Sequence, residues 1–210
     1  MNSANAAEQI FNILKDTYKD ARVSLNHNNP FQLLVATILS AQCTDVRVNK
    51  ITPKLFDKYP NPKSLAQAKL EELEAIIKST GFFHNKAKNI ISCCNELVDK
   101  YNSIVPHTMN ELVALPGIGR KTANVVLGNA YNKPAIVVDT HVKRLANRLG
   151  LTDFKNPEKI EFALMKLLQE ENWTLFSHLL IAHGRKICIA RAPQCMICSI
   201  KTLCRHFNTS

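Results

Sequence analysis

Apolar residues recur along most of the chain at helical spacing, three or four positions apart. One face of the opening segment collects apolar side chains: Ala7, Ile10, Phe11, Leu14 and Tyr18. Asn29 followed by Pro30 is a favourable helix start, with a capping side chain and then a proline in the first turn. Residues 31–40 are apolar nearly all round, so we expect a buried helix there.

The same spacing predicts further helices, and the chain is therefore predicted to be all-α. They cover residues 45–59, 65–79, 85–101, 120–131, 141–149, 157–170 and 173–187. Thr44 is the expected cap of the first of these, and Pro53 should kink or split it. The β-branched run 133–138 is short and is expected to be an extended connector.

A tight turn interrupts the helical pattern at residues 108–131. Thr108 and Glu111 form a capping box for a short helix, which Pro116 and Gly117 then end. A second helix starts at Arg120, which gives the form of a helix-hairpin-helix motif. The amides of Gly117 and Gly119 would face outward at a helix N-terminus, where an anion such as a DNA phosphate is favoured. An ordinary turn between two helices is the alternative.

Charge is unevenly distributed. The chain carries a formal net charge of +10. Residues 112–152 hold six basic residues and one acid, and residues 172–210 hold five basic residues and none. Together these two stretches carry the whole net positive charge of the chain. A surplus confined in this way indicates a footprint on a polyanion.

Four cysteines lie close together near the C-terminus: Cys188, Cys195, Cys198 and Cys204. The chain has seven cysteines and no export signal in Met1 to Asp20, which argues against disulfides. The spacing C-x6-C-x2-C-x5-C contains only one short pair, whereas zinc sites usually combine two. A [4Fe-4S] cluster therefore fits better than zinc.

Composition sets the broad class. A hydrophobic share of 46% is ample for a globular core. No stretch approaches the length of a membrane span, so we expect no membrane partner. Free cysteines and a DNA partner favour a cytoplasmic location, associated with the nucleoid through DNA.

Three sequence motifs in this order resemble the endonuclease III family of the helix-hairpin-helix–Gly/Pro…Asp superfamily. They are L-P-G-I-G-R-K-T-A at 115–123, V-D-T-H at 138–141, and the cysteine spacing. The segment L-S-A-Q-C-T-D at 39–45 adds to the match, which runs from about residue 30 to 205. Members are bifunctional DNA glycosylases and apurinic/apyrimidinic (AP) lyases of base excision repair, which act on oxidised pyrimidines in double-stranded DNA.

The resemblance implies two helical lobes with a DNA-binding cleft between them, in a monomer. The central six-helix domain, residues 23–132, would contain the hairpin. The second lobe would combine the N-terminal helix, residues 1–22, with residues 133–210 and the iron–sulfur loop at 188–204.

The resemblance also implies the catalytic pair. Lys121 matches the nucleophile that attacks the sugar as an amine and forms a Schiff base, after which β-elimination cuts the strand on the 3′ side. Asp139 matches the catalytic carboxylate, which takes the amine proton and stabilises the cationic sugar. From spacing alone, Lys121 could equally contact a phosphate and Asp139 could cap the helix that follows.

Further DNA contacts follow from the same match. Gln42 would fill the space left by the extruded nucleotide, and Phe82 would wedge beside the orphaned base. Arg120, His141 and Arg191 are expected near the backbone. Alternatively, Phe82 is an exposed loop aromatic and His141 only bonds within a helix terminus.

Two other functions are the alternatives to this interpretation of the motifs. A monofunctional relative that removes adenine from mispairs lacks a lysine at the position of Lys121. A non-enzymatic iron–sulfur protein that binds DNA and senses redox state would need no Lys121–Asp139 pair.

Overall fold

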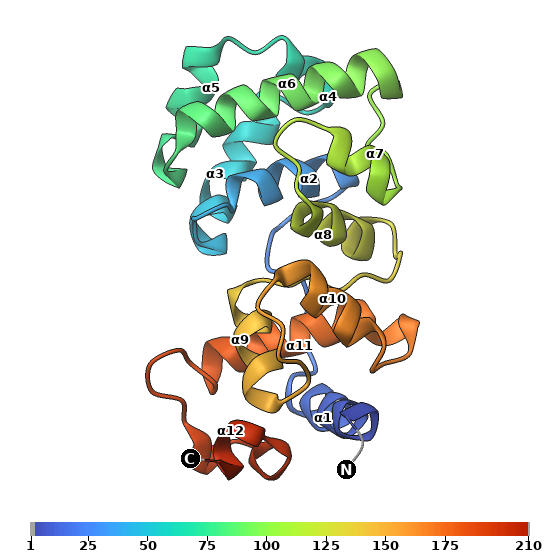
Figure 1. Cartoon of the computed structure of the whole chain (residues 1–210). Coiled ribbons are helices and arrows are strands. Elements are labelled where there is room, and N and C mark those ends of the chain that lie inside the picture. Colours follow the sequence, from blue (N-terminus) through green and yellow to red (C-terminus); the bar gives the residue numbers. More distant parts are fainter. Residues whose placement is uncertain (1–2, 210) are drawn as a thin grey trace. The chain divides into compact units, whose positions relative to one another are not determined.

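The computed structural model describes residues 3–209, and every regular element in this range is a helix, which confirms the all-α prediction. The chain divides into two compact units (Figure 1). One combines Met1–Val23 with Pro134–Ser210, and the other is Ser24–Lys133. Met1 and Asn2 of the predicted segment 1–22, and Ser210 at the other end, lie outside the described residues.

The unit Ser24–Lys133 holds the hairpin. Its helices are α2 (Pro30–Leu39), α3 (Asp45–Lys58), α4 (Pro62–Ala66), α5 (Leu70–Ile77), α6 (Phe83–Tyr101), α7 (Met109–Ala114) and α8 (Arg120–Ala130). Eight of the ten α2 side chains are buried, so α2 forms the centre of this unit. Helices α6 and α8 both pack against it.

Local caps set the helix starts in this unit. Asn29 accepts the backbone N–H of Gln32, and Thr44 accepts that of Arg47. Both caps satisfy amides that have no partner inside their own helix. The predicted starts of α2 and α3 are confirmed.

The helices of this unit differ from the prediction at two places. The predicted helix 65–79 is two helices, α4 and α5, followed by a 3-10 turn at Lys78–Thr80. Asn61 and Ser64 form a capping box that starts α4 earlier than the apolar pattern indicated. Helix α3 runs unbroken through Pro53, so the predicted split is absent.

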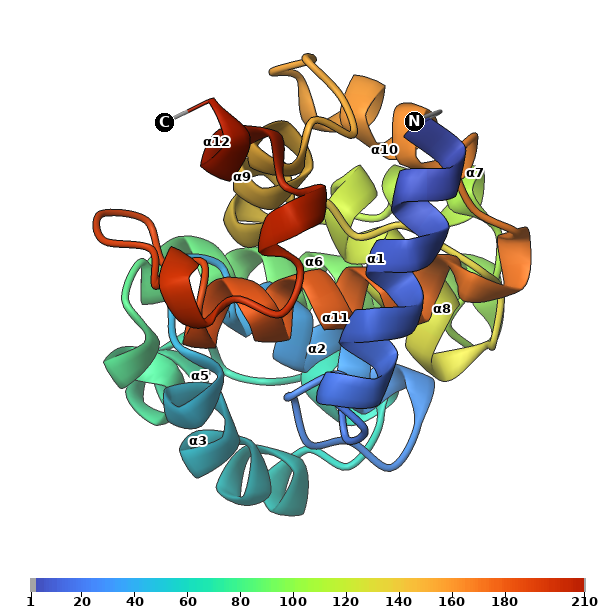
Figure 2. The ribbon, with the colours of Figure 1, turned by 90° about the horizontal axis from the view of Figure 1, so that it is seen from below.

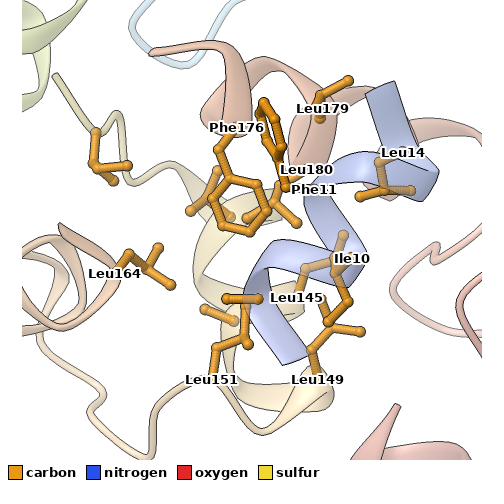
Figure 3. Close-up of a cluster of buried hydrophobic side chains, with 14 of the residues drawn as sticks. Ile10, Phe11, Leu14, Leu145, Leu149, Leu151, Leu164, Phe176, Leu179 and Leu180 are labelled. Atoms are coloured by element: carbon orange, nitrogen blue, oxygen red, sulfur yellow. The ribbon is translucent and has the colours of Figure 1, made fainter. Parts of the chain in front are cut away.

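The other unit is built around α11 (Trp173–Lys186). It also contains α1 (Ser3–Thr17), α9 (Thr140–Leu149), α10 (Pro157–Met165) and α12 (Arg205–Asn208). Helices α1 and α9 both pack on α11 (Figure 2). Phe11 of α1 and Phe176 of α11 lie side by side in the core, with ring centroids 6.3 Å apart (Figure 3).

The connector before α9 contains neither helix nor strand at residues 133–138, and it packs on α11. The Ala135 amide donates to Oγ1 of Thr174 at 3.1 Å, and the Val137 amide donates to Oγ of Ser177 at 2.9 Å. These bonds and the burial of residues 135–138 hold the chain that leads to Asp139. Helix α10 ends at Met165, short of the predicted Glu170, which instead begins a 3-10 turn.

Candidate functional site

The hairpin between α7 and α8 is anchored by apolar side chains. Leu115 and Ile118 are 3% and 6% exposed, and the Ile118 amide donates to the Leu115 carbonyl at 3.1 Å. Gly119 is the N-cap residue of α8 and supplies no capping side chain. The first amides of α8 therefore have no side-chain cap from that residue, which leaves them suited to an anion.

The two hairpin glycines differ in what they require. Gly117 has a φ of +75°, and a Cβ there would lie 2.8 Å from the Cβ of Asn89 on α6. Its glycine is thus needed by the fold itself. At Gly119 an added Cβ would meet nothing within 4 Å, and φ is −96°, which any residue can adopt. No contact with residues 3–209 explains a glycine there, whereas close approach of a ligand to the backbone would.

Lys121 occupies the first turn of α8, next to the hairpin. Its side chain is exposed, and Arg120 before it is half-buried. Helix α8 is fixed from behind by Ala123, Val126 and other buried residues that pack toward α2. The lysine thus projects from the start of a well-packed helix whose N-cap residue supplies no capping side chain.

Asp139 lies at the N-terminus of α9, in the other unit. Its Oδ1 accepts the Val142 amide at 2.8 Å, so the expected cap is present. Asp139 is half-buried. A carboxylate has two oxygens that accept hydrogen bonds, so the cap leaves the second oxygen for other work.

His141, two residues further on, bonds within its own helix. Its Nδ1 lies 3.2 Å from Nη2 of Arg144. Because a guanidinium can only donate, Nδ1 must accept, and a neutral ring then carries its hydrogen on Nε2. His141 can therefore present an N–H donor on its other edge.

Gln42 and Phe82 share an unusual backbone conformation. Their φ angles are +53° and +49°, and both side chains are exposed, Phe82 by 63%. A left-handed conformation in residues other than glycine costs on the order of 1–3 kcal/mol and tends to occur at functional positions. An exposed phenylalanine at such a position is well placed to contact a partner.

All four C-terminal cysteines line one pocket, in the unit that contains α9 and α11. The pocket encloses about 360 Å³ of space, part of it open to solvent, and apolar side chains such as Leu145, Leu149 and Phe207 complete its walls. All seven cysteines of the chain are free thiols. Within residues 3–209, no group of three or more His, Cys, Asp or Glu side chains is arranged to hold a single metal ion.

The thiols of this pocket have polar neighbours. Burial is the main cause that raises the pKa of the Cys198 thiol, so a bound cation would be needed to hold it as a thiolate. His183 Nε2 lies 3.4 Å from Cys198 Sγ, and His183 Nδ1 lies 2.9 Å from the Tyr18 hydroxyl. Burial lowers the pKa of His183 to about 4, so the ring is neutral near pH 7. If Tyr18 donates to Nδ1, then Nε2–H donates to the sulfur.

Two arginines of α9 hold the cysteine loop. Arg144 donates to the carbonyls of Gly184 and Cys188, at 2.9 Å each. Arg148 donates to the carbonyls of Ile189 and Ala190 and lies 3.4 Å from Cys188 Sγ. Sequence reasoning missed this role, although the spacing of four places both residues on one face of the helix.

Several basic residues of the predicted footprint also bond within the protein. At least five of the eleven do so: Lys133, Arg144, Arg148, Lys201 and Arg205. The other six are Arg120, Lys121, Lys143, Arg185, Lys186 and Arg191, of which Arg120 and Arg185 also have interactions within the protein.

Comparison with known proteins gives the class. Residues 35–170 match the model of the HhH-GPD superfamily of base excision DNA repair proteins. The chain is 53% identical to endonuclease III of Synechocystis sp., over 97% of this chain and 94% of the relative. It is 46% identical to endonuclease III of Bacillus subtilis, over 91% and 88%. A solved structure of a trapped endonuclease III–DNA covalent intermediate matches with a TM-score of 0.94 and 44% identity, over 100% of this chain and 99% of that one.

The matching model places the chain among base excision DNA repair proteins of the HhH-GPD superfamily. Similarity to endonuclease III over nearly the full length identifies the family within that superfamily. The chain belongs to the endonuclease III family, and it is a bifunctional DNA glycosylase and AP lyase of base excision repair. None of the helices in residues 3–209 is long and apolar enough to cross a membrane.

Proposed function

We propose that this enzyme removes oxidised pyrimidines from double-stranded DNA and then cuts the strand 3′ to the abasic site, with Lys121 as nucleophile. The observation that carries the proposal is a lysine exposed on the first turn of α8, beside amides suited to a phosphate. The solved complex with trapped DNA, at 44% identity, supports a covalent step of the same kind.

The reaction starts when the neutral amine of Lys121 attacks C1′ of the damaged nucleotide. The N–C1′ bond forms as the glycosidic bond breaks, and the base leaves with the bonding electrons and takes up a proton from water. The C1′–O4′ bond then breaks, O4′ receives the proton that Asp139 took from the amine, and a protonated Schiff base remains. This iminium acidifies the C2′ proton, whose loss breaks the C3′–O bond, and hydrolysis of the imine frees Lys121.

Asp139 acts in the first of these steps. Its second oxygen takes a proton from the attacking amine, and its charge stabilises the cationic sugar while the base departs. Because Lys121 is exposed in the DNA-free protein, bound DNA must displace the water around its side chain.

The remaining residues hold the DNA. The amides at Gly117 and Gly119 bind a phosphate at the start of α8, next to Arg120. Gln42 fills the vacated stack and Phe82 wedges beside the orphaned base. His141, through Nε2–H, and Arg191 contact the backbone on the other unit. Because its partner is DNA, we place the enzyme in the cytoplasm, associated with the nucleoid.

Cys188, Cys195, Cys198 and Cys204 would hold a [4Fe-4S] cluster. The fit rests on four thiols that line one pocket with apolar walls, and on Arg148 and His183, which can donate to sulfur. The cluster would staple a loop that has few apolar anchors of its own. Hydrogen bonds from Arg144 and Arg148 to backbone carbonyls already hold the start of this loop.

A panel of duplexes, each with one lesion, tests the proposed function. Strand cleavage at thymine glycol or another oxidised pyrimidine, with a covalent adduct when borohydride is present, is the expected result. Cleavage of adenine mispairs only, or DNA binding without any adduct on abasic DNA, would support one of the two other functions.

The metal content of purified protein is predicted from the four thiols. We expect about four iron and four sulfide per chain in anaerobically prepared protein. Cys198→Ser should lower solubility and thermal stability more than it lowers the intrinsic catalytic rate, because it removes one of the four cysteines that would hold the cluster. Stoichiometric zinc without inorganic sulfide would contradict the cluster.

Alanine is expected to have different effects at the two hairpin glycines: it should lower stability at Gly117 and weaken DNA binding at Gly119. Gly117→Ala should lower the free energy of unfolding by about 1–3 kcal/mol, because its φ is positive and Asn89 lies in the way. Gly119→Ala should change stability by less than about 0.5 kcal/mol, yet weaken binding to a duplex with an abasic analogue. Thermal unfolding and fluorescence anisotropy measure the two. Normal DNA binding by Gly119→Ala would contradict the proposal that a DNA phosphate binds at Gly119.

Salt dependence reports the basic footprint. With about five or six phosphates neutralised, log K should fall with log salt at a slope of about −5. Arg191→Ala should make that slope shallower by about one unit if its side chain neutralises a phosphate. A titration series from low to physiological salt measures both. A slope near zero would rule out an electrostatic footprint.

A further inference from the structure

Lys86 is a buried lysine that the mechanism above does not use. It lies on α6 and is only 5% exposed. Burial lowers the pKa of its ammonium. A cation in such a place is costly unless it forms good hydrogen bonds, so its partners are informative.

The ammonium of Lys86 joins two chain segments. Its Nζ donates to the carbonyl of Leu39 at 2.8 Å and to the carbonyl of Thr80 at 2.9 Å. Leu39 is the last residue of α2, and Thr80 is the last residue of the 3-10 turn after α5. Carbonyls at helix C-termini have no partner inside the helix and carry the negative end of its dipole. One ammonium therefore satisfies both ends.

Each of these segments leads directly to a residue proposed to enter the DNA. Gln42 follows Leu39 by three positions, and Phe82 follows Thr80 by two. Both are exposed and have a left-handed backbone. The backbone N–H of Lys86 also donates to the Phe82 carbonyl, at 3.1 Å. Lys86 thus holds the Phe82 turn from both its side chain and its backbone.

A buried charge contributes little to stability compared with an apolar side chain of similar volume. What this ammonium fixes is the spacing between two carbonyls, and hence between the turns that carry Gln42 and Phe82. Extrusion of one nucleotide requires both side chains to enter the same region of the stack. A small drift of one turn would leave one of them out of place.

We propose that Lys86 is a positioning residue for nucleotide extrusion, which sets the spacing of Gln42 and Phe82 without touching DNA. The proposal rests on the proposed function, in which these two side chains enter the duplex. It assigns Lys86 an effect on the extrusion step rather than on overall DNA affinity or on the Schiff base.

The test uses Lys86→Met in the full-length protein and a duplex with a tetrahydrofuran abasic analogue, which the enzyme cannot cleave. The base opposite the analogue is 2-aminopurine, whose fluorescence rises when it is unstacked. Wild-type protein should raise the fluorescence, and Lys86→Met should lose most of the rise while its affinity for undamaged duplex stays unchanged. Removal of an intact oxidised base should slow by about 10- to 100-fold, the scale of a small misplacement.

Lys88→Met is the matched control, because Lys88 is exposed on the same helix, two residues away. It should behave as wild type, and Lys86→Arg should regain much of the fluorescence rise because it keeps a charged donor. Normal unstacking by a folded Lys86→Met would overturn the proposal. If that variant does not fold, Lys86→Gln and Lys86→Arg decide. Normal unstacking by both, or failure of both to fold, would leave Lys86 as a structural residue only.

The same experiment separates this inference from the function on which it rests. If wild-type protein, Gln42→Ala and Phe82→Ala all give the same fluorescence, the insertion roles are wrong and the positioning role falls with them. If Gln42→Ala and Phe82→Ala lose the rise but folded Lys86→Met keeps it, the proposed function stands and only the inference fails.

Discussion

Lys121→Gln is expected to abolish the covalent complex that borohydride traps between the enzyme and abasic DNA. Glutamine has no primary amine, so no Schiff base can form at this position. Strand cleavage at a ready-made abasic site should disappear with it. The measurement is a denaturing gel of protein and labelled DNA after reduction.

DNA binding by Lys121→Gln should persist, since one cation of several is lost. Lys121 is exposed on α8, so we expect a stability change within about 0.5 kcal/mol. Lys143→Gln, another exposed lysine of the same basic stretch, is the matched control and should trap normally. Normal trapping by Lys121→Gln would mean that a different amine is the nucleophile.

Asp139→Asn is expected to slow removal of an intact damaged base by about 10²-fold or more, which is the scale of losing a general base. The amine of Lys121 remains, so a ready-made abasic aldehyde should still be trapped by borohydride. Single-turnover rates on a lesion duplex and on an abasic duplex measure the two effects separately.

A second variant separates the two roles of Asp139. Asparagine caps helices about as well as aspartate, so Asp139→Asn should keep the bond to the Val142 amide and the stability of α9. Asp139→Ala loses the cap as well and should cost about 1 kcal/mol more. Equal loss of base removal in both variants, with unequal stability, is the expected pattern. Normal base removal by Asp139→Asn would exclude a catalytic carboxylate there.

Helix starts could be predicted from the sequence because caps are local. Asn29, Thr44, Asn156 and Asp139 each accept an amide three positions ahead, within their own segment. The spacing of apolar residues was misleading where it continues across a gap between two helices. The run 65–79 keeps its apolar residues in phase, so the gap between α4 and α5 left no mark in the periodicity.

Contacts distant in sequence could not be predicted. Arg144 and Arg148 were counted as cations for DNA, but they bind carbonyls about forty residues away. Lys86 reaches the Leu39 carbonyl across forty-seven positions. Spacing shows that such side chains share a helix face, but only the packed structure shows which groups they meet.

At the candidate site, the sequence indicates the backbone conformation of some residues and not of others. Gly117 was singled out because glycine can adopt a positive φ, and its φ is +75°. Gln42 and Phe82 also have positive φ, yet neither residue type indicates this in a sequence. Their turns are held by the surrounding structure, Lys86 included, and their roles in DNA binding stay predictions.

The most direct test of the central claim is to locate the trapped DNA on the protein. Enzyme is reduced with borohydride on an abasic duplex, digested with a protease and a nuclease, and examined by mass spectrometry. The expected result is a single sugar adduct on the peptide that contains Lys121. An adduct on any other amine, or none under conditions that cleave the strand, would contradict the assignment of Lys121 as the nucleophile.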